Sequence, residues 1–440
     1  MGNLKYSNTV FLNLVIASII PFLIWGPFFP DLITSISSLF FLYYVFKNKN
    51  FYFFFKKPII IFFIFCIYCI SISIFIAEDI FLSFESSLFF FRIGVFSCFI
   101  WYLIEKDKSI LIFFYYALIL CFLALVIDGY FQYYTGANLF GFKLHGIRVS
   151  SFFGDELIMG SYLSRLFPLL FALFLIKQKQ RFEIYFIGLL FILIDVLIYM
   201  SGERTSFYFL NLSTIFIIIL IKDYQKFRLV TFIIAIVCIV ILSINSSSLT
   251  DRMIFTPAKD MGIIKNSTIN SSTQSTQSTQ SAQKTEESEL NETAFIIFTK
   301  GHDSFIRTAF NIFKEKPILG HGPKMFRLLC KNKKYAVGIS PCSTHPHNFY
   351  IQLLAETGLV GFLFLFSSLI YVLYVALAQL KSIVFNKKRP LTDYQVCLLS
   401  AIMITVWPLS PNGNFFNNWL MIVYSLPVGF YLQSIYSSSD

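Results

Sequence analysis

The feature that most constrains this chain is a series of apolar stretches separated by short polar segments. Most are ~15 to 25 residues long, enough for a helix to cross about 30 Å of hydrocarbon. Hydrophobic residues form 56% of the chain and charged residues only 13%, a balance that excludes a soluble globular protein. We therefore expect an all-α polytopic membrane protein with about twelve transmembrane helices. The stretches lie at approximately residues 10–29, 31–46, 58–77, 86–104, 110–127, 157–176, 182–200, 207–221, 229–244, 349–377, 394–410 and 414–435.

The distribution of Lys and Arg orients these helices. The net charge is +11, and a cytoplasmic N-terminus places most of the basic loop residues on the cytoplasmic side, as the positive-inside rule requires. We therefore expect a bacterial inner-membrane protein with both termini in the cytoplasm and no nucleic-acid partner. The first apolar stretch lacks a small-x-small cleavage site, so it is expected to remain as a helix. The cytoplasmic set is Lys47, Lys49, Lys56, Lys57, Lys106, Lys108, Lys177, Lys179, Arg181, Lys222, Lys226, Arg228, Lys381, Lys387, Lys388 and Arg389.

One long polar segment, residues 245–348, divides the chain and faces the periplasm in this orientation. It separates an N-terminal bundle of about nine helices, residues 1–244, from a C-terminal bundle of about three, residues 349–440. Within it, residues 266–292 carry Ser-Thr-Gln repeats and are expected to be disordered. Residues 294–298 and 306–313 have the spacing of amphipathic helices, which Pro317, Gly320 and Gly322 bring to an end.

Two of the eight cysteines lie in this periplasmic segment, and the other six lie in apolar stretches. In an oxidising compartment Cys330 and Cys342 are expected to form a disulfide, although two free thiols are the alternative. The disulfide would close a short loop just before His345 and stiffen that approach.

Histidines mark the region where we expect the chemistry. The chain has only five, and His302, His321, His345 and His347 all fall in the periplasmic segment. If Asn348 caps the helix that follows, His347 lies at the positive end of the helix dipole, which disfavours the imidazolium form. A neutral imidazole is suited to act as general base for an alcohol.

Arginines in the outward loops suit a phosphate or pyrophosphate ligand, because a guanidinium can bind it through two hydrogen bonds. Arg204 follows an apolar stretch within Gly202-Glu203-Arg204-Thr205, and Arg307 lies in the amphipathic piece upstream of His347. Arginines beside lipid headgroups are the alternative, which Arg148, Arg252 and Arg327 fit better.

Charged residues also occur inside apolar stretches, where they are costly unless paired or hydrated. Arg92, Arg165 and Asp195 are of this kind, and Arg165 and Asp195 form a plausible pair on adjacent helices. Glu356 lies about two and a half helical turns beyond His347 and is expected to orient it indirectly or to hydrate the entrance.

Several motifs are absent from the sequence. There is no Gly-rich phosphate loop, no Asp-x-Asp motif and no spaced Cys/His zinc set, so we expect no cofactor and no metal. A periplasmic site has no ATP supply, so a synthetic reaction there needs a substrate activated beforehand. A sugar linked to a lipid pyrophosphate fits two arginines and a base.

These residues resemble the O-antigen ligase and O-antigen polymerase superfamily of bacterial envelope glycosyltransferases. His347-Asn348, nine intervening residues and Gly358-Leu359-Val360-Gly361 are similar to the family's signature. Pro317-Ile318-Leu319-Gly320-His321-Gly322 resembles its Pro-x-x-Gly-x-Gly turn, and Gly202 to Thr205 resembles its short-loop arginine motif. Arg148 to Glu156 resembles a weaker motif. The resemblance is firm over about residues 185–375 and topological elsewhere.

The resemblance implies the helical bundle of the C-type glycosyltransferases and a metal-independent, inverting transfer. Arg204 and Arg307 would bind undecaprenyl pyrophosphate and His347 would activate the acceptor hydroxyl, with Arg252 as the alternative to Arg307. The acceptor would be lipid A core in a ligase, or another lipid-linked glycan in a polymerase. The substrate-binding surface is expected to include Arg148, His321, His345, Asn348 and Glu356.

Two other functions compete with this hypothesis. A polytopic transporter or flippase of lipid-linked or anionic substrates would also use many helices and intramembrane arginines, but it binds near the bilayer midplane, often between repeated halves. No repeat is evident here, and the histidines lie in an outward segment. A receptor or anchor explains neither the two arginines nor the histidine before the capped helix.

Overall fold

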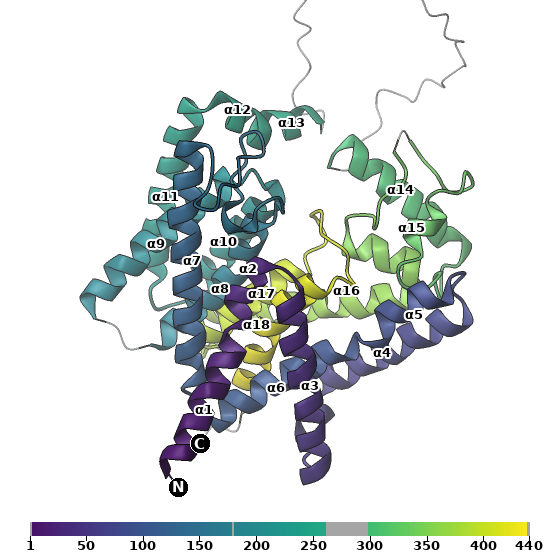
Figure 1. The fold of residues 1–440 in the computed structure, drawn as a ribbon, viewed down its shortest axis with the longest axis horizontal. Coiled ribbons are helices and arrows are strands. Elements are labelled where there is room, and N and C mark those ends of the chain that lie inside the picture. Colours follow the sequence, from purple (N-terminus) through teal and green to yellow (C-terminus); the bar gives the residue numbers. More distant parts are fainter. Residues whose placement is uncertain (1, 178–179, 261–297, 339, 438–440) are drawn as a thin grey trace, which may run out of the picture.

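The computed structural model describes residues 2–177, 180–260, 298–338 and 340–437, and these residues fold almost entirely into helices (Figure 1). Within these ranges β-structure is limited to the isolated bridges Ala137–Lys143 and His145–Arg148. The expected all-α polytopic fold is therefore confirmed.

The N-terminal helices follow the apolar stretches. They are α1 (Gly2–Ala17), α2 (Ile19–Trp25), α3 (Phe28–Asn48), α4 (Lys57–Phe75), α5 (Ile80–Leu88), α6 (Phe91–Lys106), α7 (Ile110–Thr135), α8 (Met159–Ile176), α9 (Arg181–Met200), α10 (Arg204–Leu220) and α11 (Gln225–Asn245). Three helices follow the long polar segment, namely α16 (Phe349–Val384), α17 (Asp393–Thr405) and α18 (Asn418–Tyr436).

Nine helices of the described ranges are long and apolar enough to cross a membrane. Three shorter apolar helices, Thr9–Trp25, Arg204–Leu220 and Asp393–Thr405, complete the series. All of the predicted stretches are thus helical, while the number of crossings stays a prediction.

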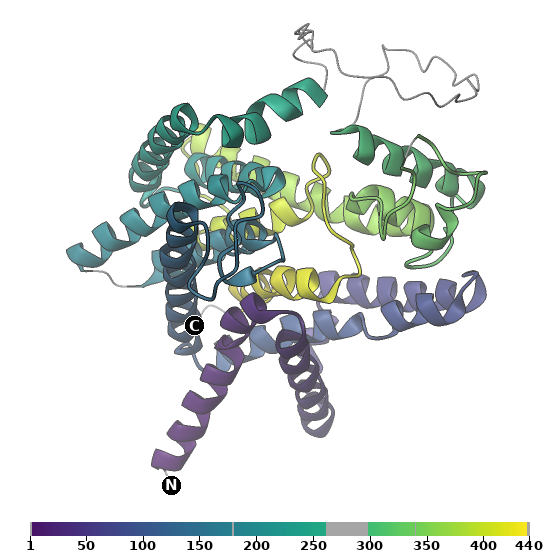
Figure 2. The same cartoon turned by 45° about the horizontal axis from the view of Figure 1, so that its top comes forward.

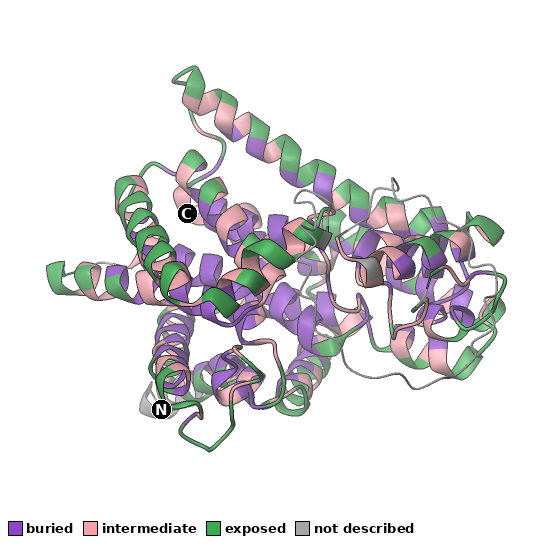
Figure 3. Cartoon of the chain, turned by 90° about the horizontal axis from the view of Figure 1, so that it is seen from above, coloured by how far each residue is buried: buried purple, intermediate pink, exposed green. Residues whose placement is uncertain are grey.

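The centre of the molecule is built from helices far apart in the sequence. α8 packs against α17 and α10, and α6 packs against α18 and α3. Nearly every residue of α8 is buried, whereas α11 and α16 expose apolar side chains, among them Val237 and Leu363. Figure 3 shows buried and exposed residues on the helices of the bundle. Exposed apolar faces around a buried centre are typical of a bundle solvated by lipid.

The predicted pairing of Arg165 with Asp195 is wrong. Asp195 on α9 binds Arg228 on α11 through two hydrogen bonds of 2.9 and 3.1 Å, and both side chains are buried. Arg228 was expected in a cytoplasmic loop, but α11 begins at Gln225 and packs on α9, which carries Arg228 inside. Arg92 is paired with Asp31.

The described part of the long polar segment, residues 245–348, forms a small layer on the bundle. It contains α12 (Ser247–Thr250), the π-helical turn η3 (Asp251–Phe255), α13 (Thr256–Asp260), α14 (Lys300–Glu315) and α15 (Phe326–Leu329). The predicted piece 306–313 lies in α14, which ends directly before Lys316 as expected. Residues 266–292 and 294–297 lie outside the described residues.

Side chains of α14 and α15 share a second core that rests on α16. Ala309 and Ile312 of α14, with Phe326 and Leu329 of α15, pack against Ala355 of α16. Cys330, which is buried in the same core, forms a disulfide with Cys342. α14 is therefore fixed against the start of α16.

Both chain ends lie on the lower side of Figure 1, opposite α12 to α15. The hydroxyl of Tyr52 donates to the carbonyl of Tyr436 over 2.9 Å, and the ammonium group of Lys56 lies 5.1 Å from the Tyr436 ring. The C-terminal helix thus ends beside a basic loop that the charge pattern assigns to the cytoplasm.

Candidate functional site

The start of α16 is fixed by Asn348. Its side-chain oxygen accepts hydrogen bonds from the backbone amides of Tyr350 and Ile351, at 3.0 and 3.2 Å. Its side-chain nitrogen donates to the carbonyls of Pro408 and Ser410, at 2.8 and 3.2 Å. Asn348 therefore caps the helix, as predicted, and also ties it to the loop between α17 and α18. Figures 1 and 2 show this loop, in yellow, reaching up between the α7–α11 side and the α14–α16 side.

His347 precedes this cap in a left-handed backbone conformation, with φ of 56°. Such a conformation is uncommon for a residue other than glycine and needs support from its surroundings. The amide of Asn412, in the α17–α18 loop, supplies it by donating to the His347 carbonyl over 2.7 Å.

The His347 ring lies in a cluster of imidazoles. Its centroid is 4.1 Å from that of His345 and 5.3 Å from that of His302 on α14, and Phe305 stacks on it at 5.4 Å. The hydroxyl of Ser343 lies 3.2 Å from Nε2. The sequence analysis grouped these histidines in one segment, and the structure brings three of them into contact.

Burial keeps these imidazoles neutral. It lowers the pKa of His347 to about 4, and the nearby His302 contributes to the same shift. Burial and the neighbouring His347 lower the pKa of His345 to about 3. The pKa of His302 is lowered by burial and by the charge of Arg204. A ring nitrogen able to accept a proton is thus available at neutral pH.

Three arginines meet at the loop between α9 and α10. Gly202 adopts φ of 65°, and a Cβ there would lie 2.8 Å from Nε of Arg252 and 2.9 Å from Cγ of Arg148. Arg252 donates to the Gly202 carbonyl at 3.0 Å, Arg148 donates to the Ser201 carbonyl at 3.1 Å, and Arg204 donates to the Arg252 carbonyl at 2.8 Å. Only glycine leaves room for these side chains to converge.

The arginine cluster (Arg148, Arg204 and Arg252) is concentrated positive charge. The pKa of Arg148 is lowered by burial and then by Arg252 and Arg204, while Glu203 opposes the shift. Arg204 also lowers the pKa of His302, so the charge of this member of the cluster acts on one of the imidazoles. An anion would be favoured where these residues meet.

Glu203 fixes the shape of this loop. Its carboxylate accepts from the amides of Gly160 and Ser161, at 2.6 and 2.9 Å, and from the Ser206 hydroxyl at 2.8 Å. The first two amides open α8, so Glu203 satisfies donors at a helix N-terminus. Burial raises its pKa, while the hydrogen bonds and Arg148 act in the opposite direction.

The structure does not bring every predicted residue to this cluster. The Nε of Arg307 donates to Asp303 over 2.6 Å, and its side chain faces a pocket of about 600 Å³ that is shared with Phe310 and Lys314. His321 is buried, and its Nε2 lies 3.1 Å from the Ile312 carbonyl. Burial lowers the pKa of this imidazole too.

Glu356 is also buried, but it serves the backbone rather than His347. Its carboxylate accepts from Gln352 at 3.0 Å and faces the Phe326 amide at 3.4 Å. Gln352 in turn donates to Asn414 at 2.8 Å and accepts from the Phe415 amide at 2.9 Å. Glu356 therefore connects the turn before α15 to the α17–α18 loop.

The two glycine motifs pack on each other, backbone against backbone. α16 kinks at Gly358, which adopts φ of 63° and ψ of −162°. The kink frees the Glu356 carbonyl to accept from the Gly322 amide at 2.7 Å, and the Leu359 amide donates to the Pro317 carbonyl at 2.8 Å. A Cβ on Gly358 would lie 2.2 Å from the Ile318 carbonyl oxygen, so the spacing of both motifs follows from this contact.

Arg165 supports the same loop from inside the bundle. It is 5% exposed, and its guanidinium donates to the hydroxyls of Tyr424, at 2.9 Å, and of Ser161. It also donates to the side-chain oxygen of Asn412 at 3.3 Å, and the Asn412 amide binds His347. The sequence marked Arg165 as buried charge, but nothing in it linked Arg165 or Asn412 to His347.

The sequence analysis gave too little weight to two residues of the site, His302 and Arg252. His302 was counted among the periplasmic histidines but given no role, and Arg252 was only the alternative to Arg307. Both depend on how elements far apart in the chain come together, because η3 contacts the α9–α10 loop through Arg252 and α14 contacts the His347 corner through His302 and Phe305. Spacing within a single segment carries no signal for such contacts.

Fold and site together define a multi-pass membrane protein with a basic, histidine-lined cluster beside a kinked helix. A family model described as O-antigen ligase matches residues 187–366, from α9 to the first part of α16 after its kink. The resemblance to the O-antigen ligase and polymerase superfamily is thereby confirmed, and it indicates a bacterial membrane enzyme of O-antigen ligase or polymerase type. No curated protein matches the chain.

The match contains Arg204, Arg252, Arg307 and His347. Arg148, Arg165 and Asn412 lie outside residues 187–366 and join the site only through the fold.

Proposed function

We propose that this protein transfers a glycan from undecaprenyl pyrophosphate to an acceptor sugar hydroxyl, with inversion, at the periplasmic face of the inner membrane. The observation that carries the proposal is the His347 ring, which burial keeps neutral and which contacts the ring of His302. The positive charge of Arg204 in turn lowers the pKa of His302. A base next to an anion-binding cluster is what such a displacement requires.

His347 is the general base. Its free ring nitrogen accepts the proton of the acceptor hydroxyl while that oxygen forms a bond to the anomeric carbon of the donor. The bond from the anomeric carbon to the pyrophosphate oxygen breaks, and the electron pair leaves with undecaprenyl pyrophosphate. Phe305 and His302 hold the ring in place and limit its hydration, which keeps it neutral.

Arg204 and Arg252 bind the pyrophosphate and stabilise the charge that develops on it as it leaves. We assign Arg252 rather than Arg307 because Arg252 and Arg204 are joined by a hydrogen bond, whereas Arg307 binds Asp303 on an outward face of α14. Arg148 adds a third charge from the loop before α8. No metal or cofactor is part of the proposed mechanism.

Arg165 and Asn412 are positioning residues. Neither has a role in bond making, but Asn412 holds the His347 carbonyl and Arg165 holds Asn412. Their effect on the reaction would pass through the placement of the ring.

The acceptor decides between the two enzymes of the superfamily. Lipid A core as acceptor makes the protein a ligase, which we favour, and a second lipid-linked glycan makes it a polymerase. The test uses purified wild type and His347→Ala, undecaprenyl-pyrophosphate glycan, and lipid A core or no added acceptor, read by gel mobility.

Transfer to lipid A core by wild type alone supports the ligase, and laddering of the donor without it supports the polymerase. Donor carried across vesicles without any product would instead support a transporter and overturn the proposal.

A further inference from the structure

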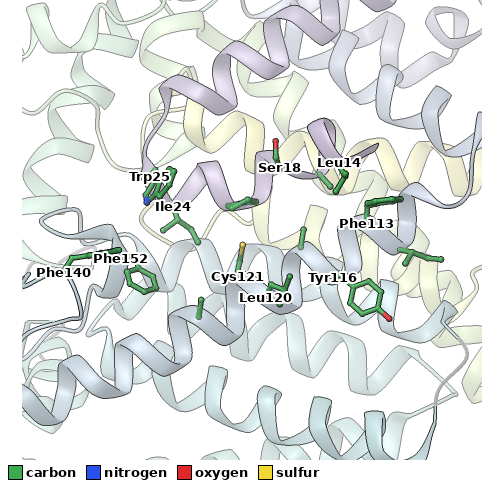
Figure 4. Close-up of a pocket in the computed structure, with 15 residues that line it drawn as sticks. Leu14, Ser18, Ile24, Trp25, Phe113, Tyr116, Leu120, Cys121, Phe140 and Phe152 are labelled. Atoms are coloured by element: carbon green, nitrogen blue, oxygen red, sulfur yellow. The ribbon is translucent and has the colours of Figure 1, made fainter. Parts of the chain in front are cut away.

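A groove of about 740 Å³ runs along the membrane-facing side of the bundle between α1–α2 and α7 (Figure 4). Its α7 wall extends from Ile112 to Ala124, which corresponds to about 18 Å of helix. The α1–α2 wall extends from Leu14 to Trp25. The lining side chains are almost all apolar.

Small side chains make this groove. Ala17 and Ser18 on the α1–α2 wall face Ala117, Cys121 and Ala124 on α7, so the two helices pack without filling the space between them. Helices that pack this loosely leave a channel open to a chain-like apolar molecule. The groove therefore offers about 18 Å of continuous apolar wall to a hydrocarbon tail.

One end of the groove meets the loop that carries Arg148. Phe140 and Phe152 of this loop line the groove at that end, next to Trp25 (Figure 4). The side chain of Gln132, on α7, accepts from the amides of Ser150 and Ser151 at 3.0 and 2.7 Å, so the loop is fixed there.

The same loop joins the groove to the arginine cluster. Arg148 precedes Phe152 by four residues, at most about 14 Å of extended chain, and the Val149 amide donates to the Met200 carbonyl at the end of α9 over 3.3 Å. A molecule with an apolar tail and a pyrophosphate head would span these two environments.

The opposite end of the groove has a polar boundary. The hydroxyl of Tyr116, which lines the groove, accepts from the ammonium group of Lys177 over 2.9 Å. Lys177 belongs to the basic side of the membrane, so the groove runs from near that side to the outward loop.

We propose that this groove holds the polyprenyl tail of the donor, with its pyrophosphate at Arg148, Arg204 and Arg252. The inference rests on the proposed function and adds a tail-binding site outside the family match. The tail fixes the donor laterally, and the head group reaches the imidazoles only when the tail is seated.

The test compares two ligands that share a head group and differ in tail length. Dissociation constants of undecaprenyl pyrophosphate and farnesyl pyrophosphate are measured for the whole protein in phosphatidylglycerol-containing nanodiscs. The variants Ala117→Trp and Ala124→Trp fill the groove. The matched control is Leu189→Trp, which adds the same side chain to α9 at a position that is 56% exposed and outside the groove.

Wild type is expected to bind the long-tailed ligand at least tenfold more tightly. Each groove variant is expected to lose that preference and to keep the farnesyl affinity, while Leu189→Trp changes neither. Equal effects on both ligands, or none, overturn the inference. A third outcome would also overturn the inference. In it, native mass spectra show phosphatidylglycerol bound to wild type but not to Ala124→Trp, while polyprenyl binding is the same in both proteins.

Failure of the proposed function gives a different result. In that case neither pyrophosphate binds, or Arg204→Ala binds both as tightly as wild type does. Loss of both affinities in Arg204→Ala, with loss of the tail preference alone in Ala124→Trp, would separate the head-group site from the tail site.

Discussion

At the scale of single residues, the protonation state of His347 is the most consequential property of the site. Burial and the neighbouring His302 lower its pKa to about 4, well below the ordinary value for an imidazole. Protonation removes the base, so the active form persists as pH falls and is lost only near this lowered pKa.

This shift predicts the acidic limb of the rate profile. An imidazole with a pKa of about 6.5 would lose about tenfold in rate at pH 5.5, whereas wild type is expected to lose little. His302→Ala removes a neighbour that can become charged and also part of the side-chain surface that buries His347. The pKa of His347 should therefore rise, and the loss of rate at acidic pH should begin at a higher pH. Single-turnover transfer measured from pH 4.5 to 8 checks both expectations.

His145→Ala is the matched control for this experiment, because His145 is exposed and bound to Asp155 away from the cluster. It should leave the profile unchanged. If the rate of wild type instead falls with a midpoint near pH 6.5, His347 is not a buried base with a lowered pKa.

A second residue-scale prediction separates two arginines that the sequence left as alternatives. Arg252→Ala should lower the rate about 10²- to 10³-fold, the range expected when a donor to developing negative charge is removed. Arg307→Ala should lower it less than tenfold, because its guanidinium binds Asp303 beside a different pocket. Rates with saturating donor test this.

Lys314→Ala, which changes a second cation of the Arg307 pocket, is the control and should resemble Arg307→Ala. An inactive Arg307→Ala beside an active Arg252→Ala would return the second pyrophosphate-binding role to Arg307.

At the scale of elements, the kink in α16 explains why a nine-residue spacer separates His347-Asn348 from the glycines. One straight segment, Phe349–Thr357, connects the cap to the kink, and the turn around Gly320 packs against its end. Gly358→Ala places a Cβ 2.2 Å from a carbonyl oxygen at a positive φ, so it should cost more than about 2 kcal/mol of stability.

The thermal midpoint in detergent measures this cost, together with the specific activity of the protein that remains folded. Gly301→Ala is the control, because it lies on helix α14 with nothing within 4 Å of the added Cβ. It should be neutral or slightly stabilising. A Gly358→Ala protein as stable as wild type would mean that the kink is not required.

At the scale of the whole molecule, hydrophobic patterning was sufficient to predict where the helices lie in the sequence. It was insufficient to predict which helices pack against each other. The apolar stretches, the Asn348 cap and the end of α14 could be predicted, because each depends on local sequence. The Asp195–Arg228 pair could not, since the pattern gives neither the depth nor the facing partner of a buried charge. The approach of Arg252 and His302 to the cluster depends in the same way on packing between distant segments.

Helices of the predicted N-terminal and C-terminal bundles pack on each other, and we expect each bundle to depend on the other for its fold. α8 and α6, from residues 1–244, have α17 and α18 as their main partners, and the α17–α18 loop holds both Asn348 and His347. Truncation after residue 385 should therefore uncover the buried side of α8 and release the His347 corner at once. We expect a chain that reaches the membrane but is degraded, measured as loss of membrane-bound protein and of activity together.

Co-expression of residues 386–440 as a separate segment is the matched rescue, because α17 and α18 would supply the missing faces in one piece. Restored protein with restored transfer would show that packing across the bundles assembles the site. A truncated chain that accumulates at the wild-type level would show instead that residues 1–385 fold without α17 and α18. In that case the C-terminal helices would contribute only the loop that positions His347.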